Sequence, residues 1–545
     1  MANLSQIKRD QMISFLEKLK EQHSDDESLI AFNQIEKELT SKKFGLVWEE
    51  HEEDIDMMMK SHVPVFVEEV DSEVVGNAKD KKFNFLLEGD NLHSLRLLEK
   101  THKGRISVIY IDPPYNKDKD FIYNDSIVDK LDSYKHSKWV SFMYKRLEIA
   151  HKLLTREGCI FISCDDNELH TLRMICDEIF GESNFEGHIH WRRRHNQPND
   201  KTKLIGLVAE HIVVYSKDSE YHKTFGVGKV ESTGSFSNPD NDPRGPWTSN
   251  PWKAARGRGG CKYTIITPTG RELSETWYGT KESFDSLINE NRVHWPKNGD
   301  GIPRIKIYAY EVQEEGQCAT NWWTNELFGC NQDATDELKA IFGGECPFDN
   351  PKPTKLIEAI IRLGSISKDA IILDFFAGSG STGHAVMNLN KKDGGNRQFI
   401  LCTNNENNIC DSITYPRLVS CITGKDVNGN NIDTNYCENL KYYKTDFIDK
   451  SDEELCMKLL DRNTEMIQLQ YGEKLDGDRF IIIHDEEEMD AFEKNFRKSN
   501  DLVAVFINQD ILLTLSQEKL LSNIKTFIVP NYYFDDVLRE AGEIW

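Results

Sequence analysis

The chain has 545 residues, a formal net charge of −24 and 38% hydrophobic residues, which gives room for about two to four domains around a large core. We find no run of about 20 apolar residues and no signal peptide, so we expect no membrane span, no export and a cytoplasmic location. The twelve cysteines are scattered without C-x-x-C pairs or metal-ligand spacing, and we expect reduced thiols and no metal site.

The first predicted elements are helical. Apolar residues recur at helical spacing between residues 3 and 40, which predicts a helical arm within residues 1–80. An apolar strand at 83–87 then runs into Glu88-Gly89-Asp90, and the next helix is predicted at 92–98. Asp90 would therefore lie at the carboxyl end of a strand, where doubly wound sheets bind ligands.

The next strand, at 108–111, runs directly into Asp112-Pro113-Pro114-Tyr115. This motif suits methylation of an exocyclic amine, whose lone pair is delocalised into the ring of adenine or cytosine. The Asp112 carboxylate and the Pro113 carbonyl can each accept one N–H, which favours a pyramidal amine with a reactive lone pair. Tyr115 offers a flat face to a base drawn out of its duplex, and the prolines fix φ. An ordinary turn at a strand exit is the alternative interpretation.

Alternation of helices and strands continues to about residue 219. The pattern predicts helices at 139–154 and 168–180, and buried strands at 159–164 and 211–215. Asp165 and Asp166 follow the first of these strands. We interpret the two acids as part of a loop, because methyl transfer from a sulfonium needs no metal and no further oxygen ligands are evident.

Two stretches of the chain are basic although the whole is acidic. Affinity for phosphate depends on local basic surface, and the acidic residues gather towards the chain ends. Residues 220–345 lose the helix and strand alternation and are too long for a loop, and within them 243–270 carry no acid. Aromatic residues lie between the cations, which suits contact with a nucleic-acid backbone. The expected DNA-binding residues are Arg192, Arg193, Arg194, Lys253, Arg256, Arg258 and Lys262.

Residues 371–384 predict a strand, a glycine turn and the start of a helix. Gly378 and Gly380 allow the backbone to approach a ligand, and the helix amides favour an anionic group. Gly378 to Gly383 also fits the dinucleotide fingerprint. However, the first acid after the next strand is Glu406, which is later than a nicotinamide site would place it.

The chain turns acidic beyond about residue 430. We predict a hinge at 442–447, followed by a small α/β domain with strands at 480–483 and 502–507. This domain, 431–545, has no catalytic signature, and we expect it to dock a partner subunit or a second copy.

Together the two motifs resemble one family. The Phe376–Gly380 loop is similar to the S-adenosylmethionine loop of class I methyltransferases. With Asp-Pro-Pro-Tyr placed before it, the chain resembles the β class of DNA amino-methyltransferases. The segments at 88–92, 238–247 and 351–353 are similar to the modification (Mod) subunit of type III restriction-modification systems. The resemblance covers roughly residues 45–450, and the loop departs from it at Ser381, where Thr is usual.

The resemblance implies an α/β fold, a doubly wound class I methyltransferase sheet with permuted motif order. It divides the chain into a catalytic half at 81–219, a target-recognition region at 220–345 and a cofactor-binding half at 346–430. The implied catalytic residues are Asp112, Pro113, Pro114 and Tyr115. The implied S-adenosylmethionine contacts are Asp90, Lys352, Asp374, Phe375, Phe376, Ala377, Gly378, Gly380, Thr382 and Glu406.

We therefore expect an enzyme that methylates the N6 amine of adenine in a short site of double-stranded DNA. The resemblance also implies a homodimer and a restriction (Res) helicase-nuclease partner. A solitary adenine or N4-cytosine methyltransferase is the close alternative, and an RNA methyltransferase is a further one. A nicotinamide oxidoreductase and a non-catalytic DNA-binding subunit leave the motif at 112–115 unexplained.

Overall fold

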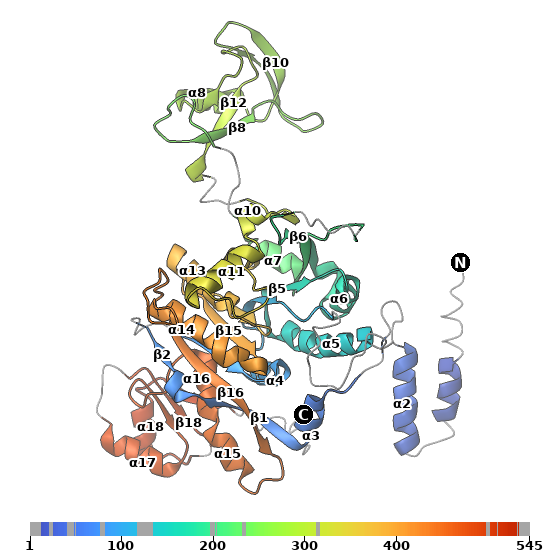
Figure 1. Ribbon diagram of the computed structural model, residues 1–545, viewed down its shortest axis with the longest axis vertical. Coiled ribbons are helices and arrows are strands. Elements are labelled where there is room, and N and C mark those ends of the chain that lie inside the picture. Colours follow the sequence, from blue (N-terminus) through green and yellow to red (C-terminus); the bar gives the residue numbers. More distant parts are fainter. Residues whose placement is uncertain are drawn as a thin grey trace.

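The computed structural model describes residues 12–20, 26–40, 48, 51–76, 82–116, 135–196, 202, 204–230, 236–311, 317–496, 502–509, 511–530 and 532–533. At its centre a large mixed sheet carries helices on both faces, and smaller units project from it (Figure 1). This arrangement confirms the expected doubly wound α/β fold.

The central sheet has eleven strands in the order β1-β16-β3-β15-β14-β4-β5-β7-β6-β13, with β2 paired to β16. Its strands are β1 (His62–Glu68), β2 (Val74–Val75), β3 (Phe83–Glu88), β4 (Ile106–Ile111), β5 (Leu154–Cys164), β6 (Phe185–Arg192), β7 (Ala209–Ser216), β13 (Trp322–Trp323), β14 (Ile371–Asp374), β15 (Gln398–Thr403) and β16 (Asn439–Asp449). From β16 to β5 the neighbouring strands are parallel, whereas β1 and β7 are antiparallel to theirs.

The strand order reverses between β4 and β14, which are neighbours despite their distance in sequence. Ile372 pairs with Val108, and Leu373 pairs with Ile109. From β4 the chain moves outward to β5, and from β14 it moves the other way to β15. Helices on such diverging connections leave a crevice at the carboxyl ends of the two strands. Both sequence motifs therefore begin at the same edge of the sheet.

Helices cover the sheet in two layers, and alternate strand residues divide between the two cores. Ile109 and Ile111 of β4 pack in the core lined by α4 (Asn91–His102), α5 (Lys135–Leu153) and α6 (Leu169–Cys176). Val108 and Tyr110 pack in the core lined by α12 (Thr354–Gly364), α13 (Ser381–Asp393) and α14 (Tyr415–Thr423). The other helices around the sheet are α3 (Asp54–Ser61), α7 (Ser219–Phe225), α10 (Asn325–Phe328) and α11 (Asn331–Ile341), with single turns at Val70–Ser72, Asp177–Gly181, Glu182–Asn184, Glu406–Asn408 and Cys410–Thr414.

Residues 236–311 form a small unit that stands away from the sheet, at the top of Figure 1. It contains β8 (Trp247–Pro251), β9 (Cys261–Ile266), β10 (Glu272–Trp277), α8 (Lys281–Asn289), β11 (Val293–His294) and β12 (Arg304–Tyr308). Ile265, Leu273, Trp277 and Phe284 form its core. The unit is shorter at both ends than the region expected at 220–345, because α7 packs on β5 and β13 pairs with β6 in the central sheet.

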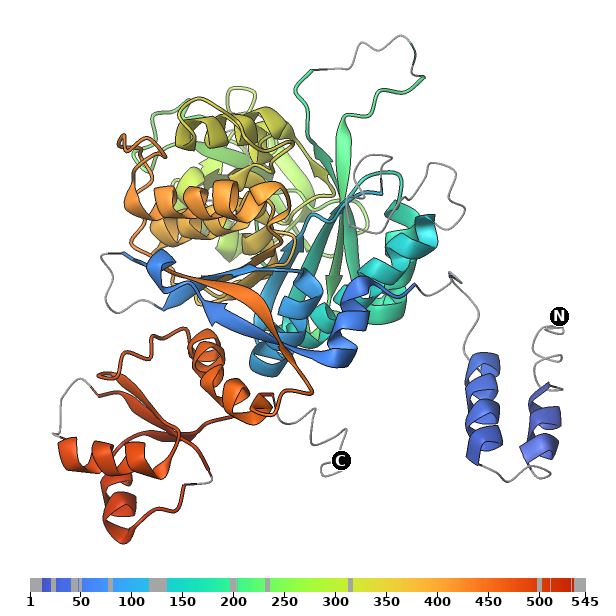
Figure 2. The same ribbon diagram turned by 60° about the horizontal axis from the view of Figure 1, so that its bottom comes forward.

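Both ends of the chain differ in part from expectation. Residues 12–20 and α2 (Asp26–Thr40) are helical and lie side by side, apart from the sheet (Figure 2). The expected helical arm at 1–80 is too long, because β1 and β2 belong to the central sheet. The expected hinge at 442–447 is wrong, since these residues lie within β16, whose backbone groups pair with both β1 and β3.

The C-terminal unit contains a parallel sheet with strand order β17-β18-β19. Its elements are α15 (Leu455–Asp461), α16 (Asn463–Tyr471), β17 (Phe480–Ile483), α17 (Glu486–Asn495), β18 (Ala504–Ile507), α18 (Leu515–Leu521) and β19 (Thr526–Ile528). The strands expected at 480–483 and 502–507 are thus confirmed. Among the helices of the described chain, none has the length and apolarity needed to cross a membrane.

Lys441 of β16 is a fully buried cation near the sheet edge. It forms ion pairs with Glu68 and Glu73, whose side chains are only 14% and 10% exposed, and the Glu73 contact measures 2.8 Å. Burial raises the pKa of Glu73, but Lys441 and Lys474 outweigh it and leave that pKa below its usual value. The buried lysine therefore neutralises carboxylates that hold β1 and the 70–75 segment on the sheet.

We predict that Lys441→Met lowers the free energy of unfolding by about 3 kcal/mol, because it leaves buried carboxylates without their cation. Lys444→Met is the matched control, since Lys444 is on the same strand but 40% exposed, and it should cost less than about 1 kcal/mol. Urea unfolding of both variants measures the difference. Equal losses would contradict the role given to Lys441.

Candidate active site

Asp112 lies where β4 ends, and its two carboxylate oxygens have different partners. The Tyr115 hydroxyl donates to Oδ1 at 2.5 Å, and the Lys352 ammonium donates to Oδ2 at 2.5 Å. Lys352 also donates to the Tyr115 hydroxyl at 3.1 Å. The Asp112 side chain remains 28% exposed, whereas that of Lys352 is 8% exposed. Tyr115 and Lys352 therefore hold the Asp112 carboxylate, and its exposed part remains open to a ligand.

The two prolines shape the turn that follows Asp112. The Pro114 carbonyl accepts a hydrogen bond of 2.8 Å from the indole of Trp139, a fully buried side chain of α5. Asn116 has a φ of 56°, and its amide donates to Glu168 at 2.6 Å. Within the described residues, the Pro113 carbonyl has no hydrogen-bond partner. It can therefore accept an N–H from a bound amine.

A buried charge network continues behind Asp112. Glu210 on β7 lies 3.4 Å from the Lys352 ammonium and forms a second ion pair with Arg193. Burial raises the pKa of Glu210, but Lys352 and Arg193 outweigh it, and the pKa is lowered. Burial lowers the pKa of Lys352, while Asp112 and Glu210 raise it more. Lys352 is consequently a stable cation between two carboxylates.

Tyr115 is held in its neutral form. Burial and then the negative charge of Asp112 raise the pKa of its hydroxyl well above the ordinary value. The hydroxyl therefore keeps its proton and can donate to Asp112. The Lys352 ammonium also lies 5.5 Å from the centre of the Tyr115 ring.

The second motif begins where β14 ends, beside the first. The Asp374 carboxylate accepts from the Phe376 amide at 3.0 Å and from the Thr382 hydroxyl at 2.5 Å. These bonds tie the strand end to the first turn of α13. Burial raises the pKa of Asp374 to about 7, although the two hydrogen bonds act against the shift.

The glycine turn between β14 and α13 requires glycine at two positions. Gly378 has a φ of +47° and Gly380 a φ of +78°, both in the left-handed region. A Cβ at Gly378 would lie 3.0 Å from the Phe348 ring. The left-handed backbone at both positions and the nearby Phe348 ring therefore disfavour any larger residue in this turn.

The expected cofactor contacts Phe375, Phe376 and Ala377 follow directly after Asp374. Phe375 is fully buried in the core, and only its carbonyl, which accepts from Asn91 at 2.8 Å, reaches a polar partner. Phe376 is partly buried, and its ring centre lies 5.9 Å from that of Phe142. Ala377 is buried within the turn.

Asp90 and Glu406 complete a row of acids at this edge of the sheet, at the ends of β3 and β15. Asp90 caps α4 through the Leu92 amide at 2.7 Å and lies 3.3 Å from the buried guanidinium of Arg146. Glu406 accepts a weak hydrogen bond of 3.5 Å from Asn404. The structure thus gathers four acids from four neighbouring parallel strands: Asp90, Asp112, Asp374 and Glu406.

Some of the expected DNA-binding cations are exposed, and others are bonded to groups of the protein itself. Arg194, Arg256, Arg258 and Lys262 are exposed, the last three of them on the 236–311 unit. Arg192 bonds the carbonyls of Arg194 and His195, and Lys253 pairs with Glu275 at 2.6 Å. The expectation for Arg193 needs correction, because its side chain is 17% exposed and pairs with Glu210 inside the buried charge network.

The chain is similar in sequence to known proteins. A family model described as DNA methylase, of the N6 and N4 type, matches residues 106–415. This chain belongs to that family. The matched range of the methylase contains both motifs and the 236–311 unit between them.

Three curated relatives of this methylase carry similar sequences. The type III restriction-modification enzyme StyLTI Mod subunit of Salmonella typhimurium is 38% identical over 367 residues, which cover 63% of this chain and 55% of the relative. The EcoP15I Mod subunit of Escherichia coli is 30% identical over 382 residues, covering 58% of both chains. The type II methyltransferase M.KpnI of Klebsiella pneumoniae is 34% identical over 349 residues, covering 58% of this chain and 79% of the relative. The methylase thus spans little more than half the length of the two Mod subunits.

Asp374 gives the methylase a testable dependence of stability on pH. An unfolded aspartate loses its proton near pH 4, whereas the folded Asp374 keeps its proton to about pH 7. The folded state therefore binds more protons within this window, so stability should fall as pH rises from about 4 to about 7 and level off above it.

We predict that the thermal unfolding midpoint falls less steeply between pH 5 and pH 7 in Asp374→Asn than in the parent. Asp165→Asn, in the loop after β5, is the control and should keep the slope of the parent. If the Asp374→Asn slope equals that of the parent, Asp374 does not hold its proton in the folded state.

Proposed function

We propose that the protein transfers a methyl group from S-adenosylmethionine to the N6 amine of adenine within a short site of double-stranded DNA. The observation that carries the proposal is the pair of acceptors at the end of β4, the exposed face of Asp112 and the carbonyl of Pro113. Two fixed acceptors can hold both protons of an exocyclic amine and favour the pyramidal nitrogen.

The residues at the end of β14 fit S-adenosylmethionine, which supplies a methyl group on a sulfonium that a neutral amine can attack directly. Gly378 and Gly380 carry no side chain that would screen the backbone from a ligand, and the first amides of α13 favour an anionic group such as a carboxylate. Asp90 and Glu406 provide acceptors for hydroxyl or amino groups. We assign the cofactor contacts to this edge, through side chains at Asp374 and Thr382 and through the backbone from Phe375 to Gly380.

The reaction at the amine needs few protein groups. Asp112 and Pro113 orient the nitrogen, and its lone pair forms the new N–C bond while the bond from that carbon to sulfur breaks. Lys352 compensates the charge of Asp112 throughout, because its ammonium lies beneath the carboxylate. The methylated nitrogen then releases one proton, which Asp112 can accept. The Tyr115 hydroxyl bonds Asp112 Oδ1 before substrate arrives, so the incoming amine replaces that bond, and the ring remains as a stacking surface.

We assign target recognition to the 236–311 unit, which projects from the sheet and carries Arg256, Arg258 and Lys262 on its surface. Such exposed cations suit phosphate contacts, and other side chains of the unit would read base edges. A base must leave the duplex to reach Asp112, and the open side of that carboxylate is compatible with this path.

We further propose that the protein is the modification subunit of a type III restriction-modification system in the cytosol. The two Mod relatives support this assignment, which includes a Res partner and a second Mod copy that would meet the C-terminal unit. A solitary methyltransferase is the second candidate, favoured by the larger share of M.KpnI that this chain spans. The acceptors at the end of β4 suit the N4 amine of cytosine equally well.

We predict that Asp112→Ala reduces methyl transfer to duplex DNA by about 100 to 1,000-fold, because one of two fixed acceptors is lost. Transfer of labelled methyl groups to DNA measures this effect, and calorimetry should find S-adenosylmethionine binding near that of the parent. Asp165→Ala is the matched control and should retain the parental rate. An undiminished rate in Asp112→Ala would remove this carboxylate from the reaction.

The exposed arginines of the 236–311 unit should contact phosphates. Arg256→Ala combined with Arg258→Ala should weaken binding to matched and unmatched duplexes alike, and should flatten the slope of log affinity against log salt by about one unit per lost contact. Lys281→Ala is the control, because Lys281 lies on α8 of the same unit and already pairs with Asp285. A double variant that changes sequence preference while leaving the salt slope unchanged would assign these arginines to bases instead of phosphates.

A further inference from the structure

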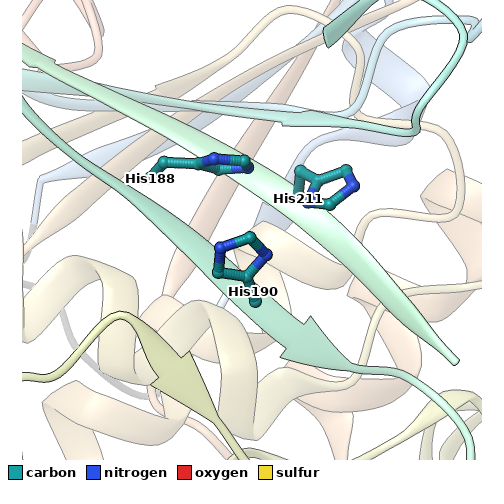
Figure 3. A group of neighbouring side chains, drawn as sticks. All are labelled: His188, His190 and His211. Carbon is teal, nitrogen blue, oxygen red and sulfur yellow. The ribbon is translucent and has the colours of Figure 1, made fainter.

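Three histidines gather on one face of the central sheet, at a place that the methyl-transfer chemistry does not use. His188 and His190 alternate along β6 with Ile189 and Trp191, whose side chains enter the core on the opposite face. His211 of β7 is the cross-strand partner of His190. The three rings lie together on the two neighbouring strands (Figure 3), and one nitrogen from each lies within 4.8 Å of the others.

Two ring nitrogens of this cluster have no hydrogen-bond partner among the described residues. His211 Nε2 lies 2.8 Å from Asp166 Oδ1, so this nitrogen carries the proton and the lone pair belongs to Nδ1. His211 Nδ1 and His188 Nε2 are both buried, and neither has a hydrogen-bond partner in the described part of the chain. Buried polar atoms without partners are uncommon, and an ion is one of the groups that satisfies them.

The Asp166 carboxylate orients one ring of this cluster. The bond from Asp166 to His211 matches the carboxylate that commonly orients a metal-bound histidine through its other nitrogen.

A simple cross-strand stack of aromatic rings is the competing explanation. His188 and His190 have ring centres 4.5 Å apart, and those of His188 and His211 are 4.8 Å apart, as ordinary packing would allow. Packing alone, however, leaves the two buried nitrogens unsatisfied and gives Asp166 no role in orienting His211.

We propose that His188, His190 and His211 bind one divalent transition metal ion, Zn²⁺ being the best match, with a fourth position open to water. Three imidazoles without thiolates suit Zn²⁺, and typical Zn–N distances of about 2.0–2.1 Å require the nitrogens, now within 4.8 Å of one another, to come within about 3.4 Å. This proposal is independent of the assigned methyl-transfer reaction.

At this place in the fold, an ion would hold two strands and a loop together. It joins β6 and β7, and through Asp166 it reaches the loop that follows β5. Glu210 precedes His211 and extends from the other face of β7, where it pairs with Lys352 beneath Asp112. An ion on the histidine face would therefore hold β7 in the place from which Glu210 contacts the buried charge network.

The decisive experiment uses the full-length protein without a polyhistidine tag. Mass spectrometry of metals after gel filtration should find about one Zn²⁺ per chain. Protein stripped with a chelator and titrated with Co²⁺ should develop the visible absorption of a four-coordinate site. Zn²⁺ should also raise the thermal unfolding midpoint of the stripped protein.

Variants locate the ion. His188→Gln and His211→Asn should abolish the Co²⁺ absorption, and Asp166→Asn should weaken Zn²⁺ affinity about 10 to 100-fold, because it orients a ligand without binding the ion. His62→Gln, a histidine of β1, is the control and should behave as the parent.

Two results would overturn the proposal. One is a parent protein that takes up neither Zn²⁺ nor Co²⁺ in competition with a chromogenic chelator, and this test holds even if a variant fails to fold. The other is parental Co²⁺ absorption in the His188→Gln and His211→Asn variants. Methyl transfer assayed in the same preparations separates loss of the ion from loss of the proposed enzymatic function.

Discussion

The ion pair between Asp112 and Lys352 is the constraint on which the rest of the site depends. Asp112 must present one carboxylate face to a ligand although the strand that carries it is buried, and an uncompensated charge there would be costly. Lys352 supplies the compensation from the segment before α12, and Glu210 in turn fixes Lys352. The sheet has to bring β4, β7 and the start of α12 together before this network can form. Its strand order does so, because β4 lies between β14 and β5, and β7 follows β5.

The same strand order places two chemical tasks side by side. Parallel strands that diverge at β4 and β14 leave their carboxyl ends facing one crevice, so the acceptors for an amine and the glycine turn for a cofactor share one edge. The insertion between the two halves of the sheet forms a separate unit, so the proposed recognition of a target would lie apart from the proposed chemistry. The histidine cluster lies on β6 and β7 of this sheet, and His211 contacts Asp166 in the loop after β5.

Local sequence patterns were enough to predict the strands and helices next to both motifs, because apolar runs and glycine turns are encoded within a few residues. Long-range pairing was not predictable in this way. The segment 442–447 has the composition of a linker, but its backbone completes the sheet between β1 and β3. Arg193 belongs to a run of three arginines and was expected at the surface, but it pairs with Glu210 inside the protein. No local sequence motif indicates that ion pair. His188 and His190 form a visible H-x-H pair, yet their third partner lies on the next strand, so an expectation based on spacing found no metal site.

Product analysis would show whether Asp112 and Pro113 hold an exocyclic amine for methylation. Duplex DNA treated with the protein and with S-adenosylmethionine carrying a deuterated methyl group would be digested to nucleosides and separated by mass spectrometry. We predict the label on deoxyadenosine at N6. Label on the N4 amine of deoxycytidine would retain the acceptor geometry and change the base. No label on any exocyclic amine, from protein shown to bind both DNA and S-adenosylmethionine, would contradict the role given to Asp112 and Pro113.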